Sequence, residues 1–140
     1  MTQEEKELLL KDLCGRLPYG VIIEITSDGG MVEASYDMRL DAGLLADLLH
    51  SEDDFKPYLR PMSSMTEEEG KELEHIFSEI DASCWVDTEY GCVDFAGGND
   101  FIDAEMAEVY IDWLNKKMFD YRGLIEKGLA IEAPTDMYNN

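Results

Sequence analysis

The sequence predicts an α+β fold, in which three to five helices pack on one or two short antiparallel β-hairpins. Apolar residues recur at helical spacing behind capping-box patterns, and β-rich segments are broken by turn signals. Hydrophobic residues make up 45% of the 140 residues, which suffices for a core. A chain of this length usually forms one domain, which we place at residues 1–134, with 135–140 as a frayed tail.

The chain is expected to begin with a helix at residues 3–14. Thr2 and Glu5 form a capping-box pattern, and leucines follow at helical spacing. Gly15 and Pro18 are expected to stop this helix, because both residues are unfavourable inside one.

A hairpin and a second short helix are expected next. Residues 19–26 and 31–36 are β-rich and flank a strong turn signal at 27–30. A helix fits residues 42–49, although a buried strand would give a similar pattern, and a charged loop follows at 51–54.

The middle of the chain predicts a loop followed by a well-capped helix. Pro57 and Pro61 disfavour helix for the residues before them, so 56–65 is expected to be an ordered loop. Residues 67–80 begin with a second capping box and acidic residues that suit a helix N-terminus. The apolar stripe of this helix is Leu73, Ile76, Phe77 and Ile80.

The last third predicts a second hairpin and two more helices. Residues 84–95 alternate apolar and polar side chains on either side of Tyr90-Gly91, and a loop follows at 96–100. A helix is expected at 103–115, and a short one at 120–127 that ends before Gly128. The apolar face of the 103–115 helix is Met106, Val109, Tyr110, Trp113 and Leu114.

Charge is the most unusual property of the sequence, since 32 acidic side chains face 11 basic ones and the formal net charge is −21. This balance argues against binding to nucleic acid or anionic membranes, which require clustered Lys and Arg. It favours a basic protein as partner. The segment 72–115 contains no Lys or Arg. Its twelve acids are Glu72, Glu74, Glu79, Asp81, Asp87, Glu89, Asp94, Asp100, Asp103, Glu105, Glu108 and Asp112.

Five of these acids form the candidate interaction face: Glu105, Glu108, Asp112, Asp103 and Asp100. The first three lie at i, i+3 and i+7 of the predicted helix, about 4.5 and 6 Å apart along its axis. One strand of duplex DNA carries a phosphate every ~3.4 Å, so a rigid row of carboxylates could imitate a phosphate track. The alternative is an ordinary solvated helix face, which is the commoner meaning of a charge block.

No metal or cofactor is expected. The nearest EF-hand frame, 94–105, has Ala96 and Gly98 at ligand positions and Asn99 where glycine is needed. Three cysteines and two histidines, including His50, lack the paired spacings of a zinc site.

No catalytic residue is expected either. Cys14 is expected on the apolar side of the first helix, and Cys84 and Cys92 inside the second hairpin, where buried thiols behave as small hydrophobes. His75 is expected on the surface among acids. A carboxylate-dependent enzyme stays open, but among 32 acids the sequence nominates no pair.

A cytoplasmic location is the default expectation. The N-terminal residues are acidic and unlike a signal peptide, and no apolar run approaches the ~20 residues of a membrane span. An odd number of cysteines fits a reducing compartment.

Four basic residues gather towards the end of the sequence, namely Lys116, Lys117, Arg122 and Lys127. They could anchor the C-terminal segments to the acidic body or contact a partner. Internal anchoring is the commoner outcome, and the first two also suit the C-terminus of a helix.

Three strings carry a resemblance to a known group of proteins: EEKELLLKDLCGRLPYGV (4–21), KPYLRPMSSMTEEE (56–69) and IDWLNKKMFDYRGLIEKGLAIEAP (111–134). Together they resemble short, uncharacterised proteins of gut-bacterial prophages and mobile elements. The resemblance implies a small intracellular accessory protein and gives no residue a role.

The leading hypothesis is therefore a non-enzymatic accessory protein that binds a basic protein, of the host or the phage, through its acidic surface. In one version of this mechanism the acidic surface mimics nucleic acid, and such mimicry would inhibit a host protein. The alternatives are a small structural or assembly protein and an enzyme with unassigned carboxylates. A homodimer is compatible with the sequence.

Overall fold

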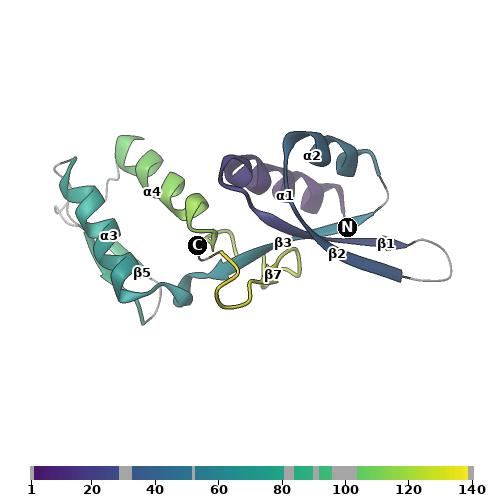
Figure 1. Ribbon diagram of the computed structural model, residues 1–140. Helices are drawn as coiled ribbons and strands as arrows, with labels where there is room; N and C mark the ends of the chain where they lie inside the picture. The colour runs from purple at the N-terminus through teal and green to yellow at the C-terminus, as the bar shows by residue number, and fades with distance from the viewer. Residues whose placement is uncertain are drawn as a thin grey trace. The chain divides into compact units, whose positions relative to one another are not determined.

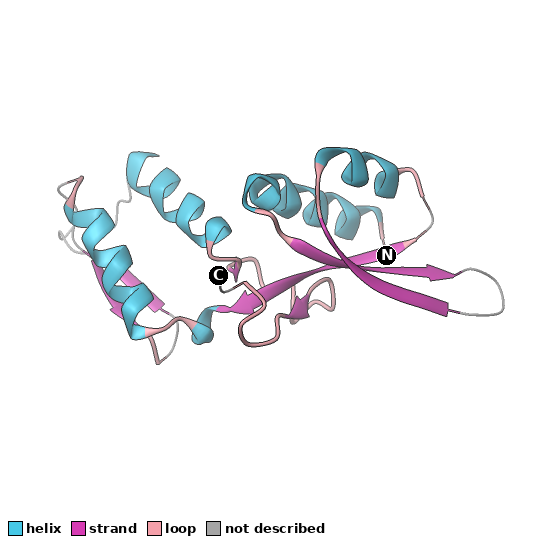
Figure 2. Cartoon of the chain, in the orientation of Figure 1, coloured by secondary structure: helices cyan, strands magenta, loops and turns pink. Residues whose placement is uncertain are grey.

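The computed structural model describes residues 2–28, 33–51, 53–80, 84–89, 92–95 and 104–138, and these residues form an α+β fold with four α-helices (Figures 1 and 2). The chain divides into two compact units: unit 1 is Met1–Leu59 with Arg122–Asn140, and unit 2 is Arg60–Tyr121. Unit 2 is thus one continuous segment inserted between two parts of unit 1. Folding as one cooperative domain stays a prediction.

The first helix, α1 (Gln3–Arg16), begins where the capping box predicts, with the Thr2 side chain accepting a hydrogen bond from a backbone N–H at 3.1 Å. The predicted stop at Gly15 is wrong, because the helix continues to Arg16 and then tightens into a 3₁₀ turn, η1 (Leu17–Tyr19). Gly20, at φ 75°, ends this turn in a left-handed conformation that suits glycine.

The second helix, α2 (Ala42–Leu49), has the predicted bounds. Asp41 caps it, with its carboxylate accepting a hydrogen bond from the backbone N–H of Leu44 at 2.7 Å. This cap favours a helix over the strand that the apolar pattern also allowed.

The sheet of unit 1 contains the predicted first hairpin, β1 (Ile22–Asp28) and β2 (Glu33–Arg39), in antiparallel register. β3 (Asp54–Pro61) pairs antiparallel with β1, and β7 (Ile131–Glu132) pairs parallel with β3. The sheet is therefore mixed and larger than the hairpin expected. Figure 1 shows α1 and α2 on one face of it. The apolar side chains buried in unit 1 include Leu9, Leu13, Ile23, Ile25, Leu45, Leu48, Phe55 and Leu59.

The predicted loop at 56–65 is wrong, since its first part belongs to β3. Pro57 is the last β3 residue paired with β1, and Pro61 is the last residue of the strand. Proline lacks the N–H that a ladder needs, but it is tolerated where pairing ends. Pro57 thus lies where β3 passes from pairing with β1 to pairing with β7, and Pro61 lies where the strand ends.

Unit 2 has the predicted order of helix, hairpin and helix. Its capping box at Thr66 and Glu69 has both reciprocal hydrogen bonds. Trp113 and Phe119 stack with ring centroids 5.6 Å apart in its core, which also contains Leu73, Phe77 and Leu114. The elements of unit 2 are η2 (Met62–Ser64), α3 (Glu67–Ser78), β4 (Cys84–Asp87), β5 (Cys92–Phe95), α4 (Ala104–Lys116) and β6 (Phe119–Asp120). β4 and β5 are antiparallel, and β6 pairs parallel with the last two residues of β3.

The predicted short helix at 120–127 is absent, and this part of the chain forms β6 and a series of turns. Gly123 has φ of 71°, a left-handed conformation that interrupts helical geometry inside the predicted span. Gly128, predicted to follow the helix, has φ of 74° and ends the last of these turns. The Tyr138 hydroxyl donates to the Tyr58 carbonyl at 2.7 Å and accepts from the Ile22 N–H at 3.0 Å. Residues 135–138 thus have a tether, and fraying of 135–140 stays a prediction.

Candidate functional site

The exposed side of α4 carries three of the five predicted interaction residues. Glu105, Glu108 and Asp112 are exposed, while Trp113 and Leu114, on the other side of the helix, are buried. We call these three acids the α4 acidic stripe. The predicted Asp103 and Asp100 lie outside the described residues.

The apolar face predicted for this helix is confirmed. Trp113 and Leu114 belong to the core of unit 2, and Met106, Val109 and Tyr110 pack against it. Phe77 of α3 lies with its ring centroid 6.2 Å from that of Tyr110. Burial of one face fixes the helix about its axis, so the acidic stripe faces solvent.

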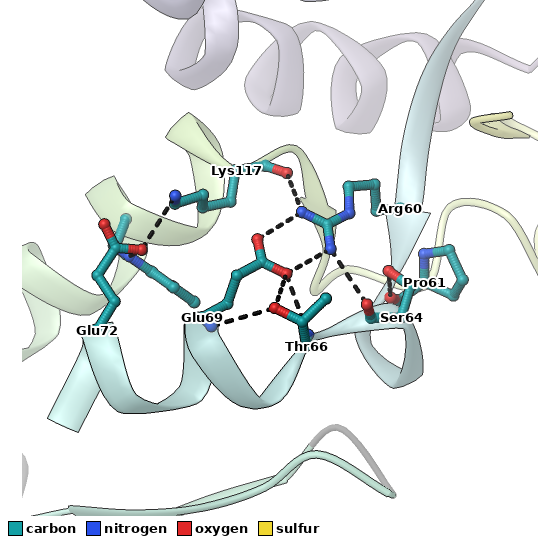
Figure 3. Close-up of polar contacts among 8 residues, drawn as sticks. Arg60, Pro61, Ser64, Thr66, Glu69, Glu72 and Lys117 are labelled. Atoms are coloured by element: carbon teal, nitrogen blue, oxygen red, sulfur yellow. Dashed lines mark hydrogen bonds and ion pairs between the residues drawn. The ribbon is translucent and has the colours of Figure 1, made fainter. Parts of the chain in front are cut away.

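Arg60 is the centre of a polar network that joins β3, α3 and the end of α4 (Figure 3). Its guanidinium donates two hydrogen bonds of 2.7 Å to the Glu69 carboxylate and others to the carbonyls of Ser64 and Lys117. It also lies 4.2 Å from the ring centroid of Phe119, in cation–π geometry. A bidentate pair of this kind fixes both position and angle.

Glu69 is ionised through this network. Burial alone would raise the pKa of Glu69, but the hydrogen bonds from Arg60 and the Thr66 backbone, with the charge of Arg60, hold the pKa below its ordinary value. Sequence reasoning missed Arg60 because it lay in a segment predicted to be a loop. The capping box at Thr66 was the available signal for Glu69.

A second ion pair ties α4 to α3. Lys117 Nζ lies 3.0 Å from Glu72 Oε2 (Figure 3). The same carboxylate oxygen also accepts a hydrogen bond from the Trp113 indole at 3.3 Å. The predicted anchoring by C-terminal basic residues is thus confirmed for Lys117, and Arg122 pairs with Asp12 in unit 1 at 2.8 Å.

The charges of unit 2 are strongly unbalanced, with sixteen acidic side chains against four Lys and Arg. Two of the four cations, Arg60 and Lys117, form ion pairs with acidic residues of α3. Within the described residues, no ion pair involves Glu105 or Glu108. The α4 acidic stripe therefore lies in a negative field that these internal pairs do not cancel.

Unit 1 has a polar cluster that sequence reasoning did not find. The Tyr58 hydroxyl lies 2.9 Å from Asp37 Oδ1 and 3.2 Å from Glu24 Oε2, and these two acids are directly opposite in the sheet. Burial and both carboxylates raise the pKa of Tyr58, which stays a neutral donor. The hydroxyl proton reduces repulsion between the two acids, so this cluster has a structural explanation.

An ionic group in the core of unit 1 was also missed. Asp12 and Arg16 are fully buried and joined by hydrogen bonds of 2.8 and 3.1 Å, and Arg122 donates to the same carboxylate. The i, i+4 spacing of Asp12 and Arg16 was a visible signal, but it is equally common on exposed helix faces.

The two cysteines with described side chains differ in burial. Cys14 is exposed, so its predicted position on the apolar side of α1 is wrong. Cys84 is buried as predicted, and burial with the charge of Glu74 raises its pKa to about 11, which keeps the thiol protonated. His75 is exposed as predicted and lies 3.3 Å from Glu79.

The comparisons with known proteins do not assign this chain to a family. Protein-family models, curated proteins and solved structures gave no match to this chain. Among the described residues, no three His, Cys, Asp or Glu side chains are grouped to hold a metal ion. No helix in that part of the chain has the length and apolar character needed to span a membrane.

Proposed function

We propose that this protein acts without catalysis, by binding a basic protein through the α4 acidic stripe of unit 2. One observation carries the proposal: Glu105, Glu108 and Asp112 are exposed on a helix whose opposite face is buried. A partner with a row of Lys or Arg side chains would be steered to this surface by long-range attraction.

The internal contacts of unit 2 support a rigid presentation of these carboxylates. Lys117 binds Glu72 at one end of α4, and Trp113 and Leu114 anchor the helix in the core. A rigid array loses less conformational entropy on binding than a flexible acidic tail. The same rigidity supports nucleic-acid mimicry, in which the carboxylates occupy phosphate positions of a DNA-binding protein's site.

The resemblance to prophage and mobile-element proteins supplies the context of the proposal. The partner is then a basic protein of the bacterial host or of the phage itself, reached in the cytoplasm. Inhibition of a host DNA-binding protein is the version that mimicry favours. Direct binding of nucleic acid by the chain itself is not part of the proposal, because the net charge is −21.

Affinity capture from a gut-bacterial lysate at low and high salt tests the proposal. The wild-type chain should retain a basic protein at low salt and release it at high salt. The variant Glu105→Gln, Glu108→Gln, Asp112→Asn should lose most of that protein. A matched control, Glu7→Gln, Glu126→Gln, Glu132→Gln, removes three exposed acids of unit 1 and should retain it.

Equal retention by both triple variants would refute a role for the α4 acidic stripe. Capture of one virion protein that neither triple variant weakens would favour the assembly alternative. Competition separates the versions of binding, since a mimic and duplex DNA must exclude one another from the captured protein. Simultaneous binding of both would contradict mimicry and leave acidic-surface binding intact.

A further inference from the structure

β2 forms a free edge of the sheet in unit 1. β2 is the last strand in the sheet order and pairs only with β1 among the described residues (Figure 1). Residues 35–39 are all exposed. An edge strand offers unpaired N–H and C=O groups to another strand.

Two large apolar side chains are exposed on this strand. Tyr36 and Met38 are 47% and 44% exposed, and they lie directly opposite Ile25 and Ile23, which are 0% exposed. Opposite residues in an antiparallel pair share a face of the sheet. The apolar layer of the core therefore extends onto β2 and ends there in solvent.

β2 has only part of the usual protection of an edge strand. Three of its seven residues are charged, but it contains no proline, which would prevent pairing at its position. It ends in the exposed Arg39, which makes no ion pair with any described residue in a chain of net charge −21.

We infer that β2 is a homodimer interface, in which the β2 strands of two copies pair antiparallel about a two-fold axis at Tyr36. In this register Arg39 of each copy lies opposite Glu33 of the other, and Met38 lies opposite Ala34. Opposite charges in directly opposed positions stabilise an antiparallel pair. The two half-exposed tyrosines meet at the axis and cover each other.

The neighbouring registers bring like charges together. When the two-fold axis is normal to the sheet, each residue of β2 lies opposite a residue of the same face in the other copy. The alternative registers therefore differ in which β2 residue lies on the axis, and neighbouring registers move the axis by one residue. An axis at Asp37 places the two Asp37 residues opposite each other. An axis at Ser35 places Glu33 opposite Asp37 twice. The Tyr36 register is the one of the three with only complementary charges.

Cysteine cross-linking tests the register directly. In a Cys14→Ser background, Tyr36→Cys places two thiols on the axis, about 4.5–5.5 Å apart at Cβ, and should give a disulfide-linked dimer on mild oxidation. Met38→Cys is a matched control of similar exposure. Its two thiols are offset by four residues, about 13 Å along the strands, and should not cross-link. Equal cross-linking of both variants would overturn the Tyr36 register.

A charge swap gives a second, independent test by sedimentation. Arg39→Glu should raise the dimer dissociation constant about tenfold, because like charges then face each other twice. Adding Glu33→Arg to that variant should restore wild-type association. A wild-type chain that stays monomeric at all concentrations, or a double variant no better than the single one, would overturn the inference.

The dimer interface is inferred independently of the proposed function. The salt dependence of dimerisation distinguishes it from binding of a basic partner. Two copies of a chain of net charge −21 repel each other, so dimerisation should strengthen as salt rises. Binding of a basic partner through the α4 acidic stripe should weaken instead. Dimerisation that weakens with salt would contradict an interface held by apolar side chains and backbone pairing.

Discussion

Buried charge is the clearest feature at the scale of single residues. Asp12 accepts hydrogen bonds from Arg16 and Arg122, and both Asp12 and Arg16 are inaccessible to solvent. A buried pair contributes little net stability, because desolvation offsets the attraction. Removal of one partner is costly, since the other charge is left without compensation in the core.

Asp12→Asn should therefore lower the free energy of unfolding by about 3–5 kcal/mol, measured by urea denaturation. Asp47→Asn, at an exposed position of α2, is the control and should change it by less than about 0.5 kcal/mol. A loss at Asp12 as small as at Asp47 would contradict this description of the core.

Glu69 gives a prediction for pH. The pKa of Glu69 in the folded protein lies below the ordinary 4.5, so the ionised carboxylate stabilises the fold. This stabilisation is fully present at pH values above the ordinary pKa and is lost as pH falls through the pKa of the folded state. Glu69→Gln should cost about 1–3 kcal/mol at pH 7, and the difference from wild type should shrink at acidic pH. Glu68→Gln, next to it and exposed, should show no such convergence. A constant difference at all pH values would refute the Arg60–Glu69 pair.

The two described cysteines should differ in reactivity. At pH 8 a thiol with a pKa of about 11 has about a hundredfold less thiolate than one at the ordinary 9.0, and burial slows access further. Peptide mapping after brief alkylation of the native protein should find the exposed Cys14 modified faster than the buried Cys84. Similar rates would show that Cys84 is not held in the core of unit 2.

At the scale of elements, the packing of α3 on β4 depends on Gly70. A Cβ at this position would lie 3.1 Å from Val86 Cγ1 and 3.2 Å from Thr88 Cγ2, so these side chains would have to shift by a few tenths of an ångström. Glycine inside a helix normally costs stability, and here it permits close packing instead.

Gly70→Ala should lower the free energy of unfolding by about 1–2 kcal/mol, despite the better helix propensity of alanine. Gly43→Ala in α2 is the matched control, because the nearest atom to its Cβ is Asp41 Oδ1 at 3.5 Å. The control should be neutral or stabilising by up to about 1 kcal/mol. A stabilising Gly70→Ala would contradict the tight contact between α3 and β4.

The elements also show what the sequence could predict. Four of the five predicted helices and both predicted hairpins are present, and each had local signals, namely caps, apolar periodicity or turns. The fifth helix, predicted at 120–127 from the glycine that follows it, is absent. β3 was missed because Pro57 and Pro61 were interpreted as loop residues. This segment is a strand because it pairs with β1 and β7, which are distant in sequence. The two-residue strands β6 and β7 are too short for any periodicity.

At the scale of the whole molecule, charge and chain path matter most. Unit 2 is an insertion within unit 1 and combines sixteen acids with four bases, of which two are held by α3. Sequence periodicity predicted the exposed stripe of α4 correctly. The capping box of Glu69 and anchoring by Lys117 had signals in the sequence, but their partners did not. The sequence did not predict that Arg60 binds Glu69 or that Lys117 binds Glu72, because tertiary packing decides which side chains meet.

The central claim is that the α4 acidic stripe of unit 2 binds a basic protein. The most direct measurement is the dissociation constant of the captured protein, over a series of salt concentrations, for wild type and both triple variants. We expect a shallower salt dependence and at least tenfold weaker low-salt binding for Glu105→Gln, Glu108→Gln, Asp112→Asn, and we expect the unit 1 control to bind as tightly as wild type. Identical salt dependence for all three proteins would contradict the central claim.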